Sequence, residues 1–207
     1  LQRPPNGLHL RNNLFKYHAA CYGTHAAIEA TGRLCAQHRL SASDVRRVVV
    51  RAPASSDGVC NIATPRTGLE AKFSLRHTVA MALAGIDTAD MASYSDSATN
   101  DPALASLRER VHVELVRECS AMTQAEVEIE TAAGPTVRQR HDSGIPATDL
   151  AAQQLRLEAK FRSLARPVLD EASCDEILDM IERLEELPDL SPLAGLLACQ
   201  PGREQRH

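Results

Sequence analysis

Small and apolar side chains recur at helical spacing between residues 26 and 35, which predicts a helix that ends near His38. The run consists of Ala26, Ala27, Ile28, Ala30, Leu34 and Cys35. Thr24 stands just before it and is a predicted N-cap, because a threonine hydroxyl can accept a hydrogen bond from a free backbone N–H of the first turn. The small residues on the buried side predict a close approach to a β-sheet.

Four later segments have the alternating or β-branched pattern of strands. Val45 to Arg51 is a β-branched run that Pro53 ends, and residues 111–115 alternate between apolar and polar side chains. Residues 125–130 alternate more regularly, with a glutamate at each outward position. The turn at 133–135 leads into 136–140, which predicts a β-hairpin.

Capping signals mark two more helices. Ser74 is placed to cap a helix whose apolar positions continue to residue 84, and Gly85 is placed to end it. Asp101 and Pro102 are the predicted N-cap and first residue of a helix that runs to about residue 110. Residues 86–97 are predicted to form a short helix and a loop. About four strands and three or four helices within 24–141 predict an α+β fold with two layers.

From residue 147 to 198 the pattern predicts helices alone. One apolar stripe is formed by Leu157, Phe161, Leu164 and Val168, and a second by Ile177, Ile181, Leu184 and Leu187. Ser173 is the predicted cap of the second helix. Each stripe needs a partner surface, which either the α+β segment or a larger helical body absent from this sequence would supply.

The predicted organisation therefore has three parts. Residues 1–15 form a connector rich in loop signals, in which Leu8–Leu10 and Leu14–Phe15 allow a short edge strand. Residues 16–146 form the α+β domain, and residues 147–207 form the C-terminal helices.

Composition and charge narrow the classes of function. The chain of 207 residues has 43% hydrophobic residues and a net charge of -4, with no basic stripe, so a nucleic-acid partner is not predicted. The sequence has no apolar run near the roughly 20 residues that span a bilayer, so a membrane partner is not predicted either. Six scattered cysteines without a C-x-x-C pair predict reduced thiols in the cytoplasm and no metal site.

The densest group of proton-transferring and anion-binding side chains lies in residues 16–25. Lys16 is one of only three lysines among 23 basic residues, and a partly buried lysine can be tuned to release its proton. His25 is a candidate acid or base at the start of the first helix. The alternative is a surface histidine beside a solvated lysine. For Cys21, the residues alone favour a small buried side chain.

A second candidate group, Lys72, Arg76 and His77, surrounds the start of the helix that Ser74 caps. Helix N-termini favour anions through free N–H groups and the local dipole. A substrate with several carboxylates needs several cations, and arginine offers two parallel hydrogen bonds to a carboxylate. A solvated basic face remains the alternative.

Three motifs in series resemble the MmgE/PrpD family. The first is Lys16-x4-Cys21-x2-Thr24-His25-Ala26-Ala27-Ile28, and the second is Glu70-Ala71-Lys72-Phe73-Ser74-Leu75 leading into Val79-Ala80. The third is Gly144-Ile145-Pro146 ahead of Lys160-Phe161. Their order and rough spacing agree with the family over nearly the whole chain, and all three lysines fall inside them.

The resemblance implies cofactor-free chemistry on small polycarboxylates, which begins with a proton transfer next to a carboxylate. The family includes 2-methylcitrate dehydratase, cis-aconitate decarboxylase and iminodisuccinate epimerase. It implies catalytic roles for His25, Lys16 and His77, and substrate binding by Lys72, Arg76, Cys21 and Thr24. At His77 relatives often have tyrosine, and at Cys21 the decarboxylase has histidine, so the reaction type stays open between lyase and isomerase.

The resemblance also implies an architecture. Family members have a large helical domain and a smaller α+β lid, and the active site lies between them. This sequence is similar to the lid and the C-terminal helices, so we expect a C-terminal portion or half of a split protein. The expected partners are a polycarboxylate substrate, a helical N-terminal domain or partner chain, and a second copy in a homodimer. The competing hypothesis is a non-catalytic lid or assembly module that works only when docked.

Overall fold

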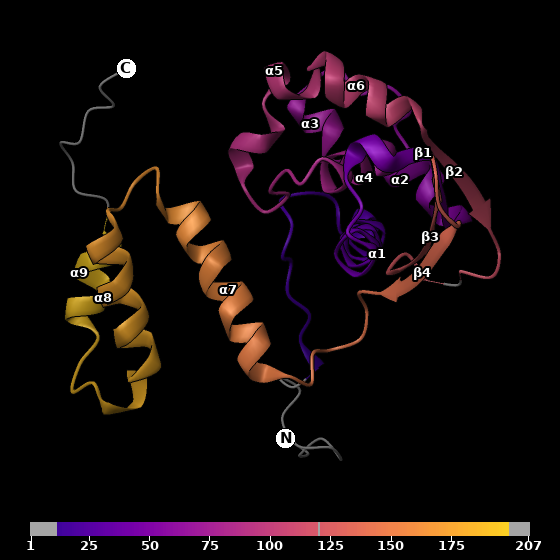
Figure 1. Cartoon of the computed structure of the whole chain (residues 1–207). Helices are drawn as coiled ribbons and strands as arrows, with labels where there is room; N and C mark the ends of the chain where they lie inside the picture. Colours follow the sequence, from indigo (N-terminus) through magenta and orange to yellow (C-terminus); the bar gives the residue numbers. More distant parts are fainter. Residues whose placement is uncertain (1–11, 120, 199–207) are drawn as a thin grey trace. The chain divides into compact units, whose positions relative to one another are not determined.

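The computed structural model describes residues 12–119 and 121–198. Its backbone divides into two compact units, Leu1–Asp149 and Leu150–His207, each of which is described by itself (Figure 1). The first unit contains a four-stranded sheet and helices, and the second contains helices, so the predicted α+β fold with a helical C-terminal segment is confirmed. The interpretation of these units as a lid and as part of a helical body stays a prediction.

The sheet of the first unit has the strand order β2-β1-β3-β4. Its strands are β1 (Val45–Pro53), β2 (Val111–Val116), β3 (Gln124–Thr131) and β4 (Val137–Asp142). β1 pairs in parallel with β2 and antiparallel with β3, and β3 and β4 form the predicted hairpin. The parallel pair needs a long crossover, which the helices between β1 and β2 supply.

The helices of this unit are α1 (Tyr22–His38), α2 (Asp57–Cys60), α3 (Gly68–Ala71), α4 (Leu75–Leu83), α5 (Asp96–Thr99) and α6 (Pro102–Glu109). Short 3₁₀ turns are η2 (Ala42–Asp44), η3 (Ala54–Ser56) and η4 (Met91–Tyr94). α1 contacts β3, β4 and α4, and α4 contacts β2 and α6. The predicted close approach of the first helix to the sheet is therefore confirmed.

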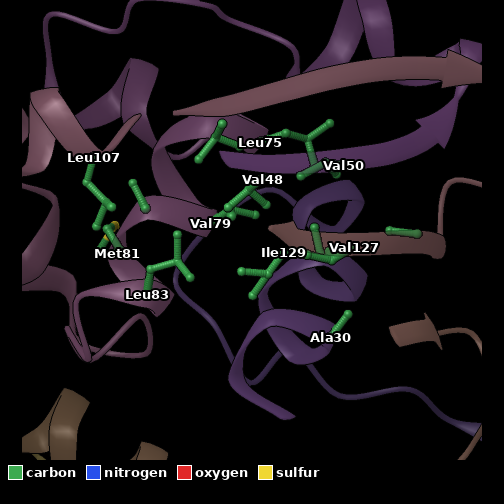
Figure 2. Close-up of a cluster of buried hydrophobic side chains, with 14 of the residues drawn as sticks. Ala30, Val48, Val50, Leu75, Val79, Met81, Leu83, Leu107, Val127 and Ile129 are labelled. Carbon is green, nitrogen blue, oxygen red and sulfur yellow. The ribbon is translucent and has the colours of Figure 1, made fainter. Parts of the chain in front are cut away.

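The core lies between these helices and one face of the sheet (Figure 2). Alternation places Val48 and Val50 of β1 on this face, together with Val127 and Ile129 of β3. Leu75 and Val79 of α4 pack against them, as Figure 2 shows. Aliphatic residues of modest size dominate, as expected for a chain with 3% aromatic residues.

The opposite face of the sheet carries a ladder of ion pairs. Arg51 of β1 contacts Glu114, Glu126 and Glu128 at 2.9–3.1 Å. Arg138 of β4 contacts Glu126 and Glu128 from the other side. The prediction that the glutamates of β3 point outward is confirmed, and their charges are balanced by arginines of the neighbouring strands.

The second unit consists of α7 (Leu150–Ala165), α8 (Glu171–Glu182), the 3₁₀ turn η5 (Leu184–Glu186) and α9 (Ser191–Leu197). α8 contacts both α7 and α9. Several large apolar side chains of the unit remain exposed; among them are Leu150, Leu155, Leu164, Val168, Ile181 and Leu197. Among the described residues, no helix is both long and apolar enough to span a membrane.

Several predicted boundaries are confirmed. Ser74 accepts a hydrogen bond from the backbone N–H of His77 at the start of α4, and Gly85 follows the helix with a φ of 68°. Asp101 caps α6, where Pro102 is the first residue. The short helix expected within 86–97 is η4, although α5 already begins at Asp96.

Two capping predictions are wrong. α1 begins at Tyr22, so Thr24 lies in its first turn and its hydroxyl donates to the Cys21 carbonyl at 2.8 Å instead of accepting from the backbone. α8 is capped by Asp170, whose carboxylate accepts from the Ser173 N–H, so Ser173 is already inside the helix.

The predicted apolar stripes are too long at their C-terminal ends. α7 ends at Ala165, before Val168, and α8 ends at Glu182, before Leu187. Pro167, two residues after Ala165, explains the early end of α7, because proline lacks a backbone N–H and disfavours helix in the residue before it. At the end of α8 the backbone leaves the helical conformation at Arg183 and continues into η5. Leu14 and Phe15 are not in a strand, and Leu8–Leu10 lies outside the described residues.

Candidate active site

The two stretches that carry the candidate residues meet through their backbones. Cys21 occupies the N-cap position of α1, and its backbone N–H donates to the Lys72 carbonyl at 2.8 Å. Lys72 in turn ends the capping-box helix α3, just before α4 begins. The start of α1 and the α3–α4 junction therefore lie side by side, although about 50 residues separate them in the sequence.

His25 lies in the buried first part of α1 and is 2% exposed. Its ring is flanked by His18, edge-on, and by Tyr22, with centroid separations of 4.8 Å in both cases. The Tyr22 hydroxyl donates to the Ser143 carbonyl at 2.6 Å, which connects α1 to the segment after β4. His25 is thus a deeply placed histidine and not the surface histidine of the alternative interpretation.

His18 is held in a fixed orientation. Its Nδ1 lies 2.7 Å from the Thr88 hydroxyl and its Nε2 lies 3.2 Å from a Glu29 carboxylate oxygen. With a carboxylate at Nε2, that nitrogen carries a proton, and the imidazole makes a T-shaped contact with the His25 ring. Glu29 and Thr88 therefore fix the ring of His18, which packs against His25.

The second candidate group divides between the surface and the core. The Lys72 ammonium lies 3.5 Å from the Met91 sulfur and 5.4 Å from the centre of the Tyr94 ring, which is a cation–π arrangement. Arg76, in the first turn of α4, donates to the side-chain oxygen of Asn61 at 2.7 Å. In the described part of the chain no carboxylate pairs with Arg76, and burial lowers the pKa of its guanidinium.

His77 has a different environment from its neighbour Arg76. Its side chain is fully buried, and the Arg108 guanidinium of α6 lies 3.2 Å from its Nδ1. Because arginine can only donate, Nδ1 is the acceptor and Nε2 carries the proton. Burial, and secondarily the charge of Arg108, lowers the pKa of His77 to about 4. His77 is therefore neutral near pH 7, and Nε2 has no hydrogen-bond partner among the described residues.

The structure thus brings some predicted residues together and separates others. Cys21, Lys72 and Arg76 lie along the α1 start and the α3–α4 junction, and Thr24 and His25 lie in the first turn of α1. Lys16 is exposed on the segment that leads into α1. His77 faces Arg108 within the core. The predicted roles of all seven residues stay predictions.

Three contacts around the predicted residues were not expected from the sequence. Glu29 lies one helical turn after His25, so its position on the same face of α1 was a usable signal. Thr88 and Asn61 come from loops, and no local pattern marks them. Across residues 12–119 and 121–198, no three histidine, cysteine or acidic side chains converge in a way that suits a metal ion.

Comparison with known proteins identifies the family. A family model described as the MmgE/PrpD C-terminal domain matches residues 18–186. The chain belongs to the MmgE/PrpD family. It contains the fold elements that carry all three motifs, from the α1 start to α7.

Two curated relatives share low sequence identity with the chain. The cis-aconitate decarboxylase of Aspergillus terreus (strain NIH 2624 / FGSC A1156) is 24% identical over 198 residues, and a second cis-aconitate decarboxylase of Aspergillus terreus is 25% identical over 199 residues. Each alignment covers 89% of this chain and 40% of the relative. The chain therefore spans well under half the length of these relatives.

Proposed function

We propose that the chain is the C-terminal portion of a cofactor-independent lyase that acts on small polycarboxylates. Its membership of the MmgE/PrpD family and its similarity to two cis-aconitate decarboxylases support this class of reaction. Within the class, the first proposed activity is a 2-methylcitrate dehydratase-like elimination of water. Decarboxylation and epimerisation are the alternatives, and the names of the two relatives favour decarboxylation.

The observation that supports the proposal most directly is that Arg76 is half-buried and has no carboxylate partner in the described part of the chain. A half-buried guanidinium has lost part of its hydration, and an ion pair normally compensates for that loss. Here its hydrogen-bond acceptor is the neutral Asn61 amide, which is itself fixed by donating to Asp57 at 2.8 Å. A bound carboxylate would complete the site with two parallel charge-assisted hydrogen bonds.

Lys72 adds a second cation beside Arg76 along the α3–α4 junction. Its ammonium contacts the Met91 sulfur and the face of the Tyr94 ring, and no carboxylate in the described part of the chain forms an ion pair with it. Two cations at one junction match a substrate with two or more carboxylates. Cys21 and Thr24 at the start of α1 are the proposed neutral contacts.

The proton transfers are assigned to His25, Lys16 and His77. A base removes the proton next to a carboxylate, and an acid donates a proton to the departing hydroxide, so the products are a conjugated alkene and water. Because His77 is neutral near pH 7, its proposed role is to donate a hydrogen bond through Nε2–H to the departing oxygen, while His25 and Lys16 exchange protons. His18, held by Glu29, packs against the His25 ring and fixes its position.

The proposed enzyme needs more chain than is present here. The family model is that of a C-terminal domain, and the relatives are longer than this chain. We propose that a helical N-terminal domain, on the same or another chain, supplies the remaining wall of the site. A homodimer of the complete assembly is the proposed oligomeric state.

A second candidate function is a lid or assembly module without catalytic residues of its own. The exposed leucines of α7 and α9 favour it, because they give the second unit an apolar surface that a partner could cover. Under this alternative, His25 and Lys16 contribute to the stability of the fold and not to catalysis.

The test is an activity panel on the chain with and without a helical N-terminal domain of the family. Citrate-like hydroxy acids and cis-aconitate are supplied, and alkene, carbon dioxide and epimer are followed by NMR. We expect one of these products with the helical domain present and none without it. Absence of every product in both cases would contradict the proposal.

Alanine variants of His25 and Lys16 in the complete assembly separate the two candidates. The catalytic proposal predicts a loss of activity of 100-fold or more, on the order expected for a lost acid–base group. The assembly-module alternative predicts full activity once the variants are shown to be folded. The exposed His112 of β2, changed to alanine, is the matched control.

A further inference from the structure

Two cysteines from distant parts of the chain both lie close to Gly23, in the first turn of α1. Gly23 has no side chain, and a methyl group at its Cβ position would lie 2.9 Å from the Cys60 sulfur and 3.9 Å from the Cys21 sulfur. Both sulfur atoms therefore lie within 4 Å of the same position, which the missing side chain of Gly23 leaves open. Cys60 is the last residue of α2, and Cys21 is the N-cap of α1.

The two thiols differ in access to solvent. Cys60 is fully buried, whereas Cys21 is partly exposed. Burial, followed by the effect of Cys21, raises the pKa of Cys60 to about 12. Cys60 therefore stays protonated in the resting protein. An oxidant from solvent therefore reaches the Cys21 sulfur first, because Cys60 is buried.

We propose that Cys21 and Cys60 are a redox-active pair that forms a reversible disulfide when the protein meets a peroxide. The Cys21 thiolate attacks a peroxide oxygen, which gives the sulfenic acid of Cys21 and releases hydroxide (or alkoxide). The Cys60 sulfur then attacks the Cys21 sulfur, the S–O bond breaks, and the Cys60 proton leaves with the hydroxyl group as water. The two thiols lose two electrons in total, and the peroxide gains them.

The location gives this bond a consequence for the neighbouring surface. Asn61, the residue after Cys60, holds the Arg76 guanidinium, and the Cys21 N–H is bonded to the Lys72 carbonyl. A bond between Cys21 and Cys60 would join the two segments that position both cations. The redox chemistry itself goes beyond the proposed function and does not depend on it.

Two other described cysteines provide controls. Cys35 lies in the same helix as Cys21 and is also partly exposed, so it tests whether exposure alone is sufficient for oxidation. Cys174 is buried in the second unit. Serine replaces each thiol with little change in size.

The test treats the full 207-residue chain with a modest excess of hydrogen peroxide. Free thiols are blocked, the protein is digested without reduction, and linked peptides are identified by mass spectrometry. We expect a peptide pair joined through Cys21 and Cys60, which a dithiol reductant separates again. Cys35→Ser should give the same product, and Cys21→Ser should give no linkage of Cys60.

Cys60→Ser provides a second measurement that does not require the disulfide. It should trap the Cys21 sulfenic acid, which a dimedone-type reagent labels more strongly than in the wild-type chain. Three results would each overturn the proposal: free Cys60 after complete oxidation of Cys21, linkage of Cys21 mainly to another cysteine, or a product that the reductant cannot reverse.

Discussion

Arg76 and His77 are adjacent in the sequence, yet the fold places them in opposite environments. The helical step between neighbours turns His77 toward Arg108 in the core and leaves Arg76 at the surface beside Asn61. The sequence predicted that both would face one ligand. Only the packing of α4 against α6 decides which one is enclosed.

Burial of His77 predicts a pH dependence of stability. In the unfolded chain a histidine takes up a proton near pH 6.5, whereas in the folded chain His77 does so at about 4. The stabilisation is therefore complete above about pH 6.5 and is lost as the pH falls toward 4. The contribution is on the order of 3 kcal/mol, as a shift of this size implies.

Urea unfolding of the wild-type chain and His77→Gln between pH 4 and 7 measures this effect. The free energy of unfolding of the wild type should fall more steeply below pH 6.5 than that of the variant. The exposed His112 serves as control, because His112→Gln should retain the wild-type slope. Equal slopes for wild type and His77→Gln would show that His77 titrates normally.

At the scale of elements, short helices are held in place by close backbone contacts. α3 begins at Gly68, whose N–H donates to the Asp96 carboxylate at 2.7 Å. A Cβ at Gly68 would lie 1.5 Å from the Tyr94 carbonyl oxygen, so α3 and η4 approach each other only because this residue has no side chain. The same contact positions Lys72 at the end of α3.

Gly68→Ala should therefore destabilise the chain strongly. The clash is with backbone, which cannot rotate away, so we expect a loss of about 2–4 kcal/mol or failure to fold. Gly32→Ala is the matched control, because Gly32 lies in α1 with nothing within 4 Å of its Cβ position. It should stabilise the chain by about 0.5–1 kcal/mol. Thermal unfolding measures the stability of both variants. An equal effect of the two substitutions would show that the close approach of Gly68 to Tyr94 does not limit the side chain at this position.

The glutamates on the outer face of the sheet are held together by Arg51. Arg51→Met removes the cation shared by Glu114, Glu126 and Glu128, and their repulsion should lower the free energy of unfolding by about 1–3 kcal/mol at low salt. High salt should reduce the loss, since it screens the carboxylates. Arg46→Met, which breaks the single exposed pair with Glu130, should change stability by about 0.5 kcal/mol or less. A loss for Arg51→Met that salt does not change would contradict the electrostatic origin.

At the scale of the whole molecule, periodicity predicted most elements and their order. Local chemistry predicted the strands β1 and β3, the β3–β4 hairpin and the caps at Ser74 and Asp101, because each depends on residues that are close together in the sequence. The central position of β1, its parallel pairing with β2 and the contact of Cys21 with Lys72 are long-range consequences of packing. No local pattern encodes Asn61 or Thr88 as site neighbours, and the burial of His77 follows from a helix that starts 25 residues later.

The family assignment and the two groups of candidate residues lead to one central claim. Arg76 is proposed to bind a substrate carboxylate within an assembly that includes a helical N-terminal domain. Its side chain is bonded only to a neutral amide in the described part of the chain, so its removal should affect ligand binding more than folding.

Steady-state kinetics of Arg76→Gln in that assembly tests the claim most directly. Loss of a charge-assisted pair should raise KM for the polycarboxylate by about tenfold or more, while the unfolding transition stays close to that of the wild type. Arg140→Gln, at an exposed position of β4, should leave KM unchanged. If Arg76→Gln retains the wild-type KM and kcat, Arg76 does not bind substrate and the α3–α4 junction is not a wall of the active site.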